Sequence, residues 1–226
     1  MHIPNSLKPN LLKLRNTICD LFPFVLKYGE TKKLKDAIAH WRAEGWVGSV
    51  PYLVKRAMLR AEARRIGAKT FVETGTYMGD TPWALRDCFR KLYSIEVQPE
   101  LAAIARKRFS RHPEVEIVQG DSAKELSALM GRVDEPALFW LDGHYSAGIT
   151  GRGAKDCPIY EELEAIAGGM RGLFSIMIDD ARCFGTDPAY PGIEQMEALA
   201  AKHFPQHQFA VWNDVIHIKP RAERGS

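Results

Sequence analysis

The chain has 226 residues, of which 46% are hydrophobic and 26% charged, so its composition is that of an ordinary globular protein and excludes a disordered one. The formal net charge of +3 is too small to indicate nucleic-acid binding by itself. No run of about 18 apolar residues occurs, so no transmembrane helix is expected.

Charge is distributed unevenly along the chain. Residues 1–65 contain 13 Lys and Arg against 5 Asp and Glu, whereas the remaining residues are mildly acidic. This change near Gly67 predicts three parts: an N-terminal helical segment over residues 1–66, a main domain over 67–219 and a flexible tail over 220–226.

The N-terminal segment leaves two interpretations open. Apolar residues between Leu11 and Phe22 share roughly one face of a helix. That face either packs against the main domain or contacts an anionic membrane surface or a second subunit of a homo-oligomer. Two further helices are expected, one over Thr31–Glu44 and one with Ser49 as its N-cap and Pro51 in its first turn.

Four cysteines lie far apart in the sequence, and none forms a Cys-x-x-Cys pair. This usage is typical of reduced thiols, and the N-terminal residues lack the features of a signal peptide. We therefore expect a cytoplasmic protein.

From residue 69 onward, short apolar runs alternate with amphipathic segments of helical length. The apolar runs predict strands at Thr70–Glu73, Leu92–Glu96, Val115–Gln119, Ala137–Asp142 and Leu173–Asp179. Helices are expected at about residues 81–90, 99–111, 122–131, 157–170 and 191–203. The last two strands, Phe209–Trp212 and Val215–Ile218, have hairpin spacing. The sequence thus predicts an α/β fold: a Rossmann-like doubly wound sheet, mostly parallel, with a C-terminal antiparallel hairpin.

Ligands of such sheets bind beyond the carboxyl ends of the strands, and this chain places acids and glycines there. The first predicted strand ends in Glu73, and two glycines in the following loop allow a ligand to approach the backbone closely. The residues of interest in this loop are Gly75, Thr76, Tyr77, Gly79 and Thr81. The loop is not a P-loop, because no Gly-Lys-Ser/Thr follows.

Two more strand ends carry an acid. Glu96 ends the second predicted strand, 21 residues after Gly75, where a carboxylate can accept both hydroxyls of a ribose. Asp121 and Ser122 follow the third strand. Asp121 either caps the next helix or accepts the amino group of an adenine ring, and the two roles are compatible.

Taken in order, these motifs resemble those of class I S-adenosylmethionine-dependent methyltransferases. The matching series is Glu73-x-Gly75-x-Tyr77-x-Gly79, Glu96, Gly120-Asp121-Ser122 and Asp142. The tyrosine between the glycines is similar to that of the cation-dependent catechol and caffeoyl-CoA O-methyltransferases. The segments Asp142-Gly143-His144 and Asp179-Asp180 resemble the macrocin-type sugar O-methyltransferases. The resemblance spans about residues 69–219 and does not cover residues 1–66.

The resemblance implies S-adenosylmethionine as the cofactor. Its methionine part would lie against Glu73, Gly75 and Gly79, with Thr76, Tyr77 and Thr81 in the same loop and Asp142 nearby. Glu96 would bind the ribose, and Asp121 and Ser122 would lie by the adenine.

The sequence also suggests a metal ion. Strands four and five of such a sheet are neighbours, so Asp142, Asp179 and Asp180 converge at one edge. Two like charges 4 Å apart repel each other by about 4 kcal/mol at an effective dielectric constant of about 20, so the cluster needs a proton or a cation. Oxygen ligands suit Mg²⁺ or a similar divalent ion, and the resemblance implies these three aspartates as its ligands. The alternative is that Asp142 contacts the cofactor and no metal binds.

Catalysis is assigned to Asp142 and His144. A divalent ion on the acceptor oxygen lowers the pKa of that hydroxyl, and His144 follows the fourth strand as the candidate base. Tyr145 could line the acceptor pocket instead.

Two loops are expected to border the acceptor site. Residues 146–156 contain three glycines and predict a mobile lid whose Arg152 or Lys155 meets the acceptor. Phe184 and Tyr190 lie in the loop expected to form the opposite wall, where they either stack on the acceptor or pack internally.

These observations favour an S-adenosylmethionine-dependent O-methyltransferase acting on a hydroxyl of a small molecule. A sugar or glycosylated metabolite is favoured over a catechol, because residues 143–146 contain no lysine. The expected partner is a small-molecule acceptor rather than nucleic acid. The alternative is a methyltransferase for RNA or protein that docks through the basic N-terminal segment.

Overall fold

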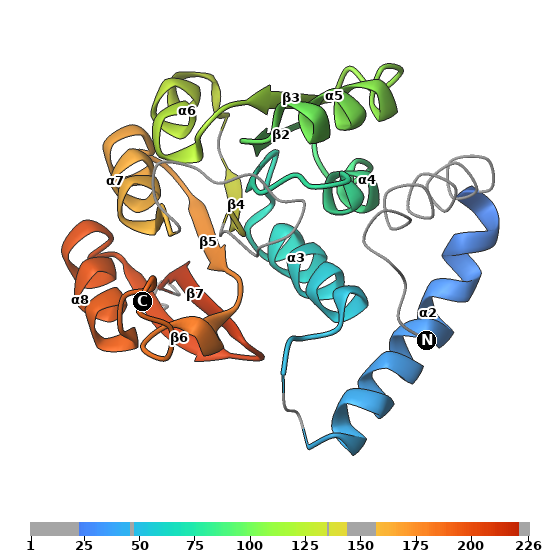
Figure 1. Cartoon of the computed structure of the whole chain (residues 1–226), viewed down its shortest axis with the longest axis horizontal. Coiled ribbons are helices and arrows are strands. Elements are labelled where there is room, and N and C mark those ends of the chain that lie inside the picture. The colour runs from blue at the N-terminus through green and yellow to red at the C-terminus, as the bar shows by residue number, and fades with distance from the viewer. Residues whose placement is uncertain (1–22, 46–47, 135, 144–156, 222–226) are drawn as a thin grey trace, which may run out of the picture. The chain divides into compact units, whose positions relative to one another are not determined.

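The computed structural model describes residues 23–45, 48–134, 136–143 and 157–221 (Figure 1). The chain divides into two compact units, Met1–Ala57 and Met58–Ser226. Helix α2 (Pro23–Ala43) lies in the first unit and begins earlier than predicted, and α3 (Tyr52–Ile66) crosses the boundary between the units. None of the described helices is long and apolar enough to cross a membrane.

The start of α3 differs from the prediction. The helix begins at Tyr52, so Pro51 precedes its first turn and Ser49 is not its N-cap. The carbonyl of Pro51 accepts the N–H of Val54 at 2.8 Å. This backbone hydrogen bond satisfies one of the N–H groups of the first helical turn, which a capping side chain would otherwise accept.

The second unit is built on one mixed sheet with the predicted topology. Its strand order is β3-β2-β1-β4-β5-β7-β6, in which β1 to β5 are parallel, β7 pairs antiparallel with β5, and β6 pairs antiparallel with β7. The strands are β1 (Thr70–Thr74), β2 (Lys91–Glu96), β3 (Val115–Gln119), β4 (Ala137–Leu141), β5 (Phe174–Ile178), β6 (His207–Trp212) and β7 (Val215–Pro220). The doubly wound sheet and its terminal hairpin are therefore confirmed.

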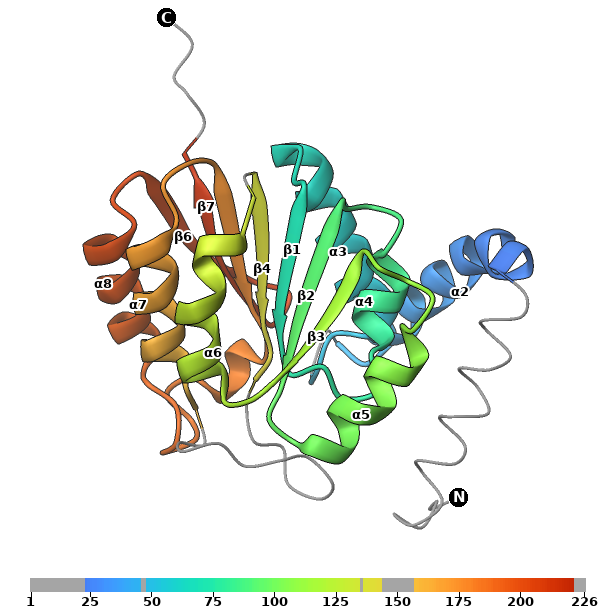
Figure 2. The same cartoon turned by 90° about the horizontal axis from the view of Figure 1, so that it is seen from above.

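Helices cover both faces of the sheet (Figure 2). One side carries α3, α4 (Asp80–Leu85) and α5 (Pro99–Arg108), and the other carries α6 (Ser122–Leu129), α7 (Ile159–Gly169) and α8 (Ile193–His203). Helix α4 is shorter than predicted, because the N–H of Cys88 turns back to the carbonyl of Leu85 and lets the chain enter β2 at Lys91. Short 3₁₀ turns follow α6 and β5, at Met130–Arg132 and Ala181–Cys183.

The apolar core therefore lies in two layers. Successive residues of a strand point to opposite faces, so Phe71 packs with the α3, α4 and α5 layer while Val72 packs with the other. Every residue of β4 is buried, as expected for a central strand with both faces covered.

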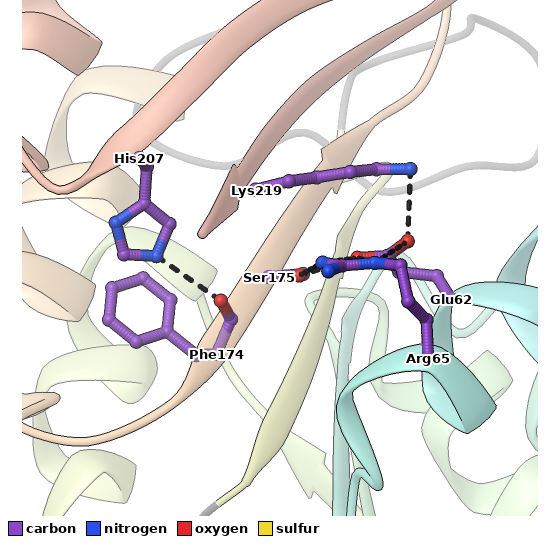
Figure 3. A network of polar contacts seen from close by, with 6 residues as sticks. All are labelled: Glu62, Arg65, Phe174, Ser175, His207 and Lys219. Atoms are coloured by element: carbon purple, nitrogen blue, oxygen red, sulfur yellow. Dashed lines mark hydrogen bonds and ion pairs between the residues drawn. The ribbon is translucent and has the colours of Figure 1, made fainter. Parts of the chain in front are cut away.

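A buried ionic network joins α3 to the sheet (Figure 3). Glu62 of α3 accepts hydrogen bonds from Arg65 at 2.7 Å and from Ser175 of β5 at 2.6 Å, and Lys219 of β7 lies 3.0 Å away. Burial alone would raise the pKa of Glu62, but the hydrogen bonds from Arg65, Ser175 and Lys219 lower it to about 2. Ser175 lies near the start of β5, so this network is at the opposite end of that strand from Asp179 and Asp180, which follow it.

Candidate functional site

The candidate site lies at the carboxyl ends of β1 and β4. The chain order reverses here, because β1 pairs with β2 on one side and with β4 on the other. Asp142 follows β4 directly, and its backbone N–H donates to the carbonyl and the hydroxyl of Thr74, each at 3.2 Å. The ends of the two strands are therefore held close together.

The loop after β1 requires both of its predicted glycines. Gly75 has φ +84°, and a Cβ there would lie 2.3 Å from the carbonyl oxygen of Asp142. Gly79 has φ +75°, and a Cβ there would lie 2.8 Å from the ring of Phe109. Side chains at both positions would be strained, and they would push the loop away from Asp142 at Gly75 and from Phe109 at Gly79.

Glu73 is the buried residue before this loop, and its side chain is hydrogen-bonded to residues on either side of the loop. Its side chain is buried, accepts a hydrogen bond from Ser94 Oγ at 2.5 Å and is also hydrogen-bonded to Thr81. The hydroxyl of Thr76 lies 2.6 Å from Ser94 Oγ, so three residues of the predicted site form one polar cluster under the loop. Burial raises the pKa of Glu73 to about 8, despite the hydrogen bonds from Ser94 and Thr81.

Arg108, at the end of α5, holds the other side of the loop. Its Nη1 donates to the carbonyl of Met78 at 2.7 Å and to Asp80 Oδ1 at 2.9 Å, and its side chain is only 6% exposed. The sequence analysis did not identify this residue. A basic residue in the last turn of a helix is ordinarily solvated, and nothing in the sequence marks this one as buried.

Glu96 lies at the end of β2, where the prediction places a ribose ligand. Its carboxylate is buried and accepts the N–H of Tyr77 at 2.7 Å and that of Gln98 at 2.9 Å. Burial raises its pKa, although the backbone donors act in the opposite direction. Each carboxylate oxygen has two acceptor positions, so Glu96 can still accept hydroxyl groups after binding these two amides.

Asp121 caps α6, as one of its predicted roles requires. Its Oδ1 accepts the N–H of Ala123 at 3.1 Å. Ser122 is buried, and its side chain is hydrogen-bonded to Glu162 of α7. Ser122 thus faces the protein interior, whereas Asp121 is partly exposed at the end of β3.

Glu162 is a further acidic residue beside the site that the sequence analysis missed. It is 1% exposed and hydrogen-bonded to Ser122 and Thr74, and its Oε1 lies 3.2 Å from where a Cβ of Gly143 would be. Burial raises its pKa to about 7. The signal was available, because Glu162 interrupts an apolar stripe formed by Ile159, Leu163 and Ile166.

The three aspartates predicted to bind metal follow neighbouring strands. Leu141 and Ile178 are register partners, and the N–H of Asp179 donates to the carbonyl of Leu141 at 3.0 Å, so Asp142 and Asp179 start from adjacent strand ends. Asp179 Oδ1 accepts the N–H of Asp180, and Asp180 forms an ion pair with Arg182 at 2.8 Å. Within the described part of the chain, no group of three His, Cys, Asp or Glu residues is placed to hold a metal ion. The metal site is therefore not confirmed.

Several predicted acceptor-site residues fall in residues 144–156, outside the described part of the chain. These are the candidate base His144, then Tyr145, Arg152 and Lys155, together with the predicted lid. On the opposite side, Phe184 is buried and packs edge-to-face against Tyr190, with ring centroids 5.2 Å apart. The internal packing of Phe184 is thus the alternative that the structure favours.

The described residues fit S-adenosylmethionine. Gly75 brings the loop after β1 against the backbone of Asp142, Glu96 offers acceptors for a ribose, and Asp121 lies at the next strand end. These groups follow β1, β2 and β3 in spatial order, so they can bind one elongated nucleoside ligand along the edge of the sheet.

Solved structures with this fold include several methyltransferases. A methyltransferase from Podospora anserina, with S-adenosylhomocysteine bound, is 16% identical with a TM-score of 0.55, over 85% of this chain and 88% of that one. An O-methyltransferase from Bacillus cereus, also in complex with S-adenosylhomocysteine, is 17% identical with a TM-score of 0.56, over 83% and 90%. The O-methyltransferase TomG from Streptomyces achromogenes, which is involved in tomaymycin synthesis and was solved with S-adenosylmethionine, is 18% identical with a TM-score of 0.52, over 83% and 89%.

Comparison of the sequence itself gives no match to a family model or to a curated protein. At these low identities, the structural likeness establishes the fold. The second unit of this chain has the fold of the class I S-adenosylmethionine-dependent methyltransferases.

Proposed function

We propose that this protein is an S-adenosylmethionine-dependent O-methyltransferase that acts on a hydroxyl group of a small molecule. The observation that carries the proposal is the position of Glu96. A buried carboxylate at the end of β2, bound to an N–H of the glycine loop, is suited to a ribose, and that loop lies against the end of β4.

Each residue of the site has a role in this proposal. When bound, S-adenosylmethionine supplies the methyl group that is transferred. Glu96 accepts the ribose hydroxyls, Asp121 receives the adenine amino group, and the backbone at Gly75 orients the methionine part beside Asp142. His144 takes the proton of the acceptor hydroxyl on a ring nitrogen, which makes that oxygen a nucleophile.

The proposed acceptor is a sugar or a glycosylated metabolite. Support comes from the resemblance of Asp142-Gly143-His144 and Asp179-Asp180 to the macrocin-type enzymes and from the lack of a lysine at residues 143–146. Replacement of His144 by Gln should reduce turnover strongly and leave S-adenosylhomocysteine binding unchanged. Full activity of that variant would rule out His144 as the base.

Assistance by Mg²⁺ or a similar ion is a separate prediction. The described aspartates do not form a three-ligand group, and Asp180 is already paired with Arg182. The proposed reaction therefore gives the metal no step and uses the side chains of the chain itself.

Calorimetry with S-adenosylhomocysteine tests the cofactor site. Replacement of Glu96 by Gln should weaken binding by about tenfold or more, because charge-assisted hydrogen bonds to the ribose are lost. The matched control is Glu194→Gln, an exposed residue of α8, which should bind like the wild type. If the wild type binds neither S-adenosylmethionine nor S-adenosylhomocysteine, the proposed function is wrong.

The second candidate is a methyltransferase for RNA or protein. The basic segment over residues 1–65 favours it, because such a segment can bind phosphates. RNA binding that weakens steeply with salt would support this candidate, and salt-independent or absent binding would contradict it. The same segment could bind vesicles of anionic lipid, which co-sedimentation measures.

A further inference from the structure

Glu162 of α7 lies where three strand ends of the candidate site meet. The residue is buried, with 1% of its surface exposed. It is hydrogen-bonded to Thr74, which ends β1, and to Ser122, which follows β3 in the first turn of α6. Its Oε1 lies 3.2 Å from where a Cβ of Gly143 would be, just beyond the end of β4. One carboxyl group is therefore placed beside the ends of β1, β3 and β4.

The hydroxyl of Thr74 connects Glu162 to the backbone of the site. Thr74 Oγ1 accepts the N–H of Asp142 at 3.2 Å. A hydroxyl has one proton to donate and two lone pairs that accept. When Thr74 donates its proton to the carboxyl of Glu162, a lone pair remains for the Asp142 N–H. Glu162 thus orients the hydroxyl that holds Asp142 beside β1.

Ser122 makes the corresponding connection at β3. The side chain of Ser122 is buried and is hydrogen-bonded to Glu162. The preceding residue, Asp121, accepts the N–H of Ala123 at 3.1 Å and is partly exposed at the strand end. The hydrogen bond between Ser122 and Glu162 therefore anchors the turn that presents Asp121.

Stability alone does not account for a glutamate at this position. Although Oε1 of Glu162 is buried, it makes no hydrogen bond with any residue that the structure describes. A buried carboxyl oxygen without a partner costs free energy, and an apolar side chain of similar volume avoids that cost. The contacts with Thr74 and Ser122 thus point to a role in the site.

We propose that Glu162 is a positioning residue of the cofactor site, which holds Asp142 and Asp121 in place for S-adenosylmethionine through the hydroxyls of Thr74 and Ser122. This inference rests on the proposed function, because Glu162 has this role only where a nucleoside binds along these strand ends. Glu162 does not itself touch the cofactor, since its side chain is buried. It acts through the two hydroxyl groups that it orients.

Calorimetry with S-adenosylhomocysteine on the full chain tests the proposal. Glu162→Leu should weaken binding by about tenfold or more, because both hydroxyls lose their acceptor. Glu162→Gln should recover most of this affinity, since an amide oxygen accepts hydrogen bonds from hydroxyls as a carboxylate oxygen does. The matched control is Glu164→Leu, at an exposed position of the same helix, which should bind like the wild type.

Ser122→Ala tests the same contact without a change at Glu162. It should also weaken binding, whereas Ser127→Ala, at an exposed position of α6, should not. In the Glu162→Leu chain, Ser122→Ala should have no further effect, because the acceptor is already lost. The single Ser122→Ala variant decides the question where Glu162→Leu does not fold.

A purely structural role of Glu162 predicts a different result. It would lower the urea midpoint of Glu162→Leu and leave the affinity of the folded protein unchanged. Unchanged affinity in Glu162→Leu or in Ser122→Ala overturns the inference, and so does an equal loss in Glu162→Leu and Glu162→Gln. These outcomes leave the proposed function intact, because the wild type still binds. If the wild type itself binds no S-adenosylhomocysteine, the proposed function fails and this inference fails with it.

Discussion

At the scale of single residues, Gly75 has two constraints at once. Its φ of +84° lies where side chains are strained, and the carbonyl of Asp142 occupies the space of a Cβ. The same close approach brings the loop after β1 against the end of β4, where the cofactor is proposed to bind. A single methyl group at this position would therefore affect both stability and binding.

Replacement of Gly75 by Ala should lower the free energy of unfolding by about 1–3 kcal/mol and weaken S-adenosylhomocysteine binding. Urea denaturation and calorimetry measure the two effects. The control is Gly168→Ala in α7, where a Cβ meets nothing within 4 Å. That change should stabilise the protein by about 0.5–1 kcal/mol, because alanine favours the helix. Equal effects at both glycines would contradict the argument.

Glu73 predicts a pH dependence of stability. Its pKa is about 8 in the folded protein, against an ordinary value of 4.5. The folded state therefore keeps a proton that the unfolded state releases, so the free energy of unfolding falls as pH rises from about 4.5 to about 8. Glu73→Gln retains a polar side chain and cannot ionise.

Urea denaturation at about pH 5 and about pH 8 should show that the wild type loses stability relative to Glu73→Gln over this interval. Parallel pH profiles of the two proteins would mean that Glu73 ionises as freely in the folded chain as in the unfolded one.

At the scale of elements, the carboxylate of Glu62 links α3 to strands β5 and β7. Glu62 is 3% exposed at its side chain and serves Arg65, Ser175 and Lys219 together (Figure 3). Replacement of Glu62 by Ala should lower the free energy of unfolding by about 2–4 kcal/mol, because Lys219 is left with an uncompensated, mostly buried charge. We expect the loss in free energy of unfolding to be near the lower end of this range, because Arg65 is 45% exposed and its ion pair is screened by solvent.

Denaturation of Glu62→Ala and of Glu62→Ala combined with Lys219→Met checks this explanation. The second change should recover part of the loss, because it removes the unpaired charge. A double variant that is less stable by the sum of the two single effects would show that the two side chains act independently.

The strands were predictable from sequence, and the tertiary contacts of single side chains were not. Val115–Gln119 is identical in prediction and structure, because its buried Val115 and Ile117 alternate with the less buried Glu116 and Val118, as in a strand with one covered face. Arg108 and Asp214 gave no local signal, because their partners at Met78 and Arg182 lie about 30 residues away.

Two other differences lie within single helices. Glu162 was detectable from sequence, because it is an acid in an apolar stripe of α7. The prediction of Ser49 as an N-cap was wrong, because α3 begins at Tyr52.

At the scale of the whole molecule, the division of the chain can be tested. The sequence predicts a boundary between residues 66 and 67, whereas the compact units meet between Ala57 and Met58. Leu59 and Ala63 of α3 are buried in the core layer that also contains Phe71. The second half of α3 thus contributes apolar surface to the domain that holds the candidate site.

A chain that begins at Lys69 should therefore be less stable than one that begins at Ser49, which retains α3. Circular dichroism during urea denaturation measures the difference, and the longer chain should keep the S-adenosylhomocysteine affinity of the full protein. Equal midpoints for the two chains would place the boundary after α3, as the charge distribution suggests.

The hairpin turn at Asp214 gives the fold a built-in order of assembly. Strands β1 to β5 and the residues proposed to bind the nucleoside precede it in the chain, yet Arg182 obtains its second carboxylate only from the turn before β7. During synthesis, Arg182 can therefore pair with Asp180 first, and its contacts with Asp214 form only when the final strand pair joins the sheet. A chain that ends before β6 would lack Asp214 and keep the pair of Asp180 and Arg182, so the end of β5 would carry one negative charge fewer than in the full chain.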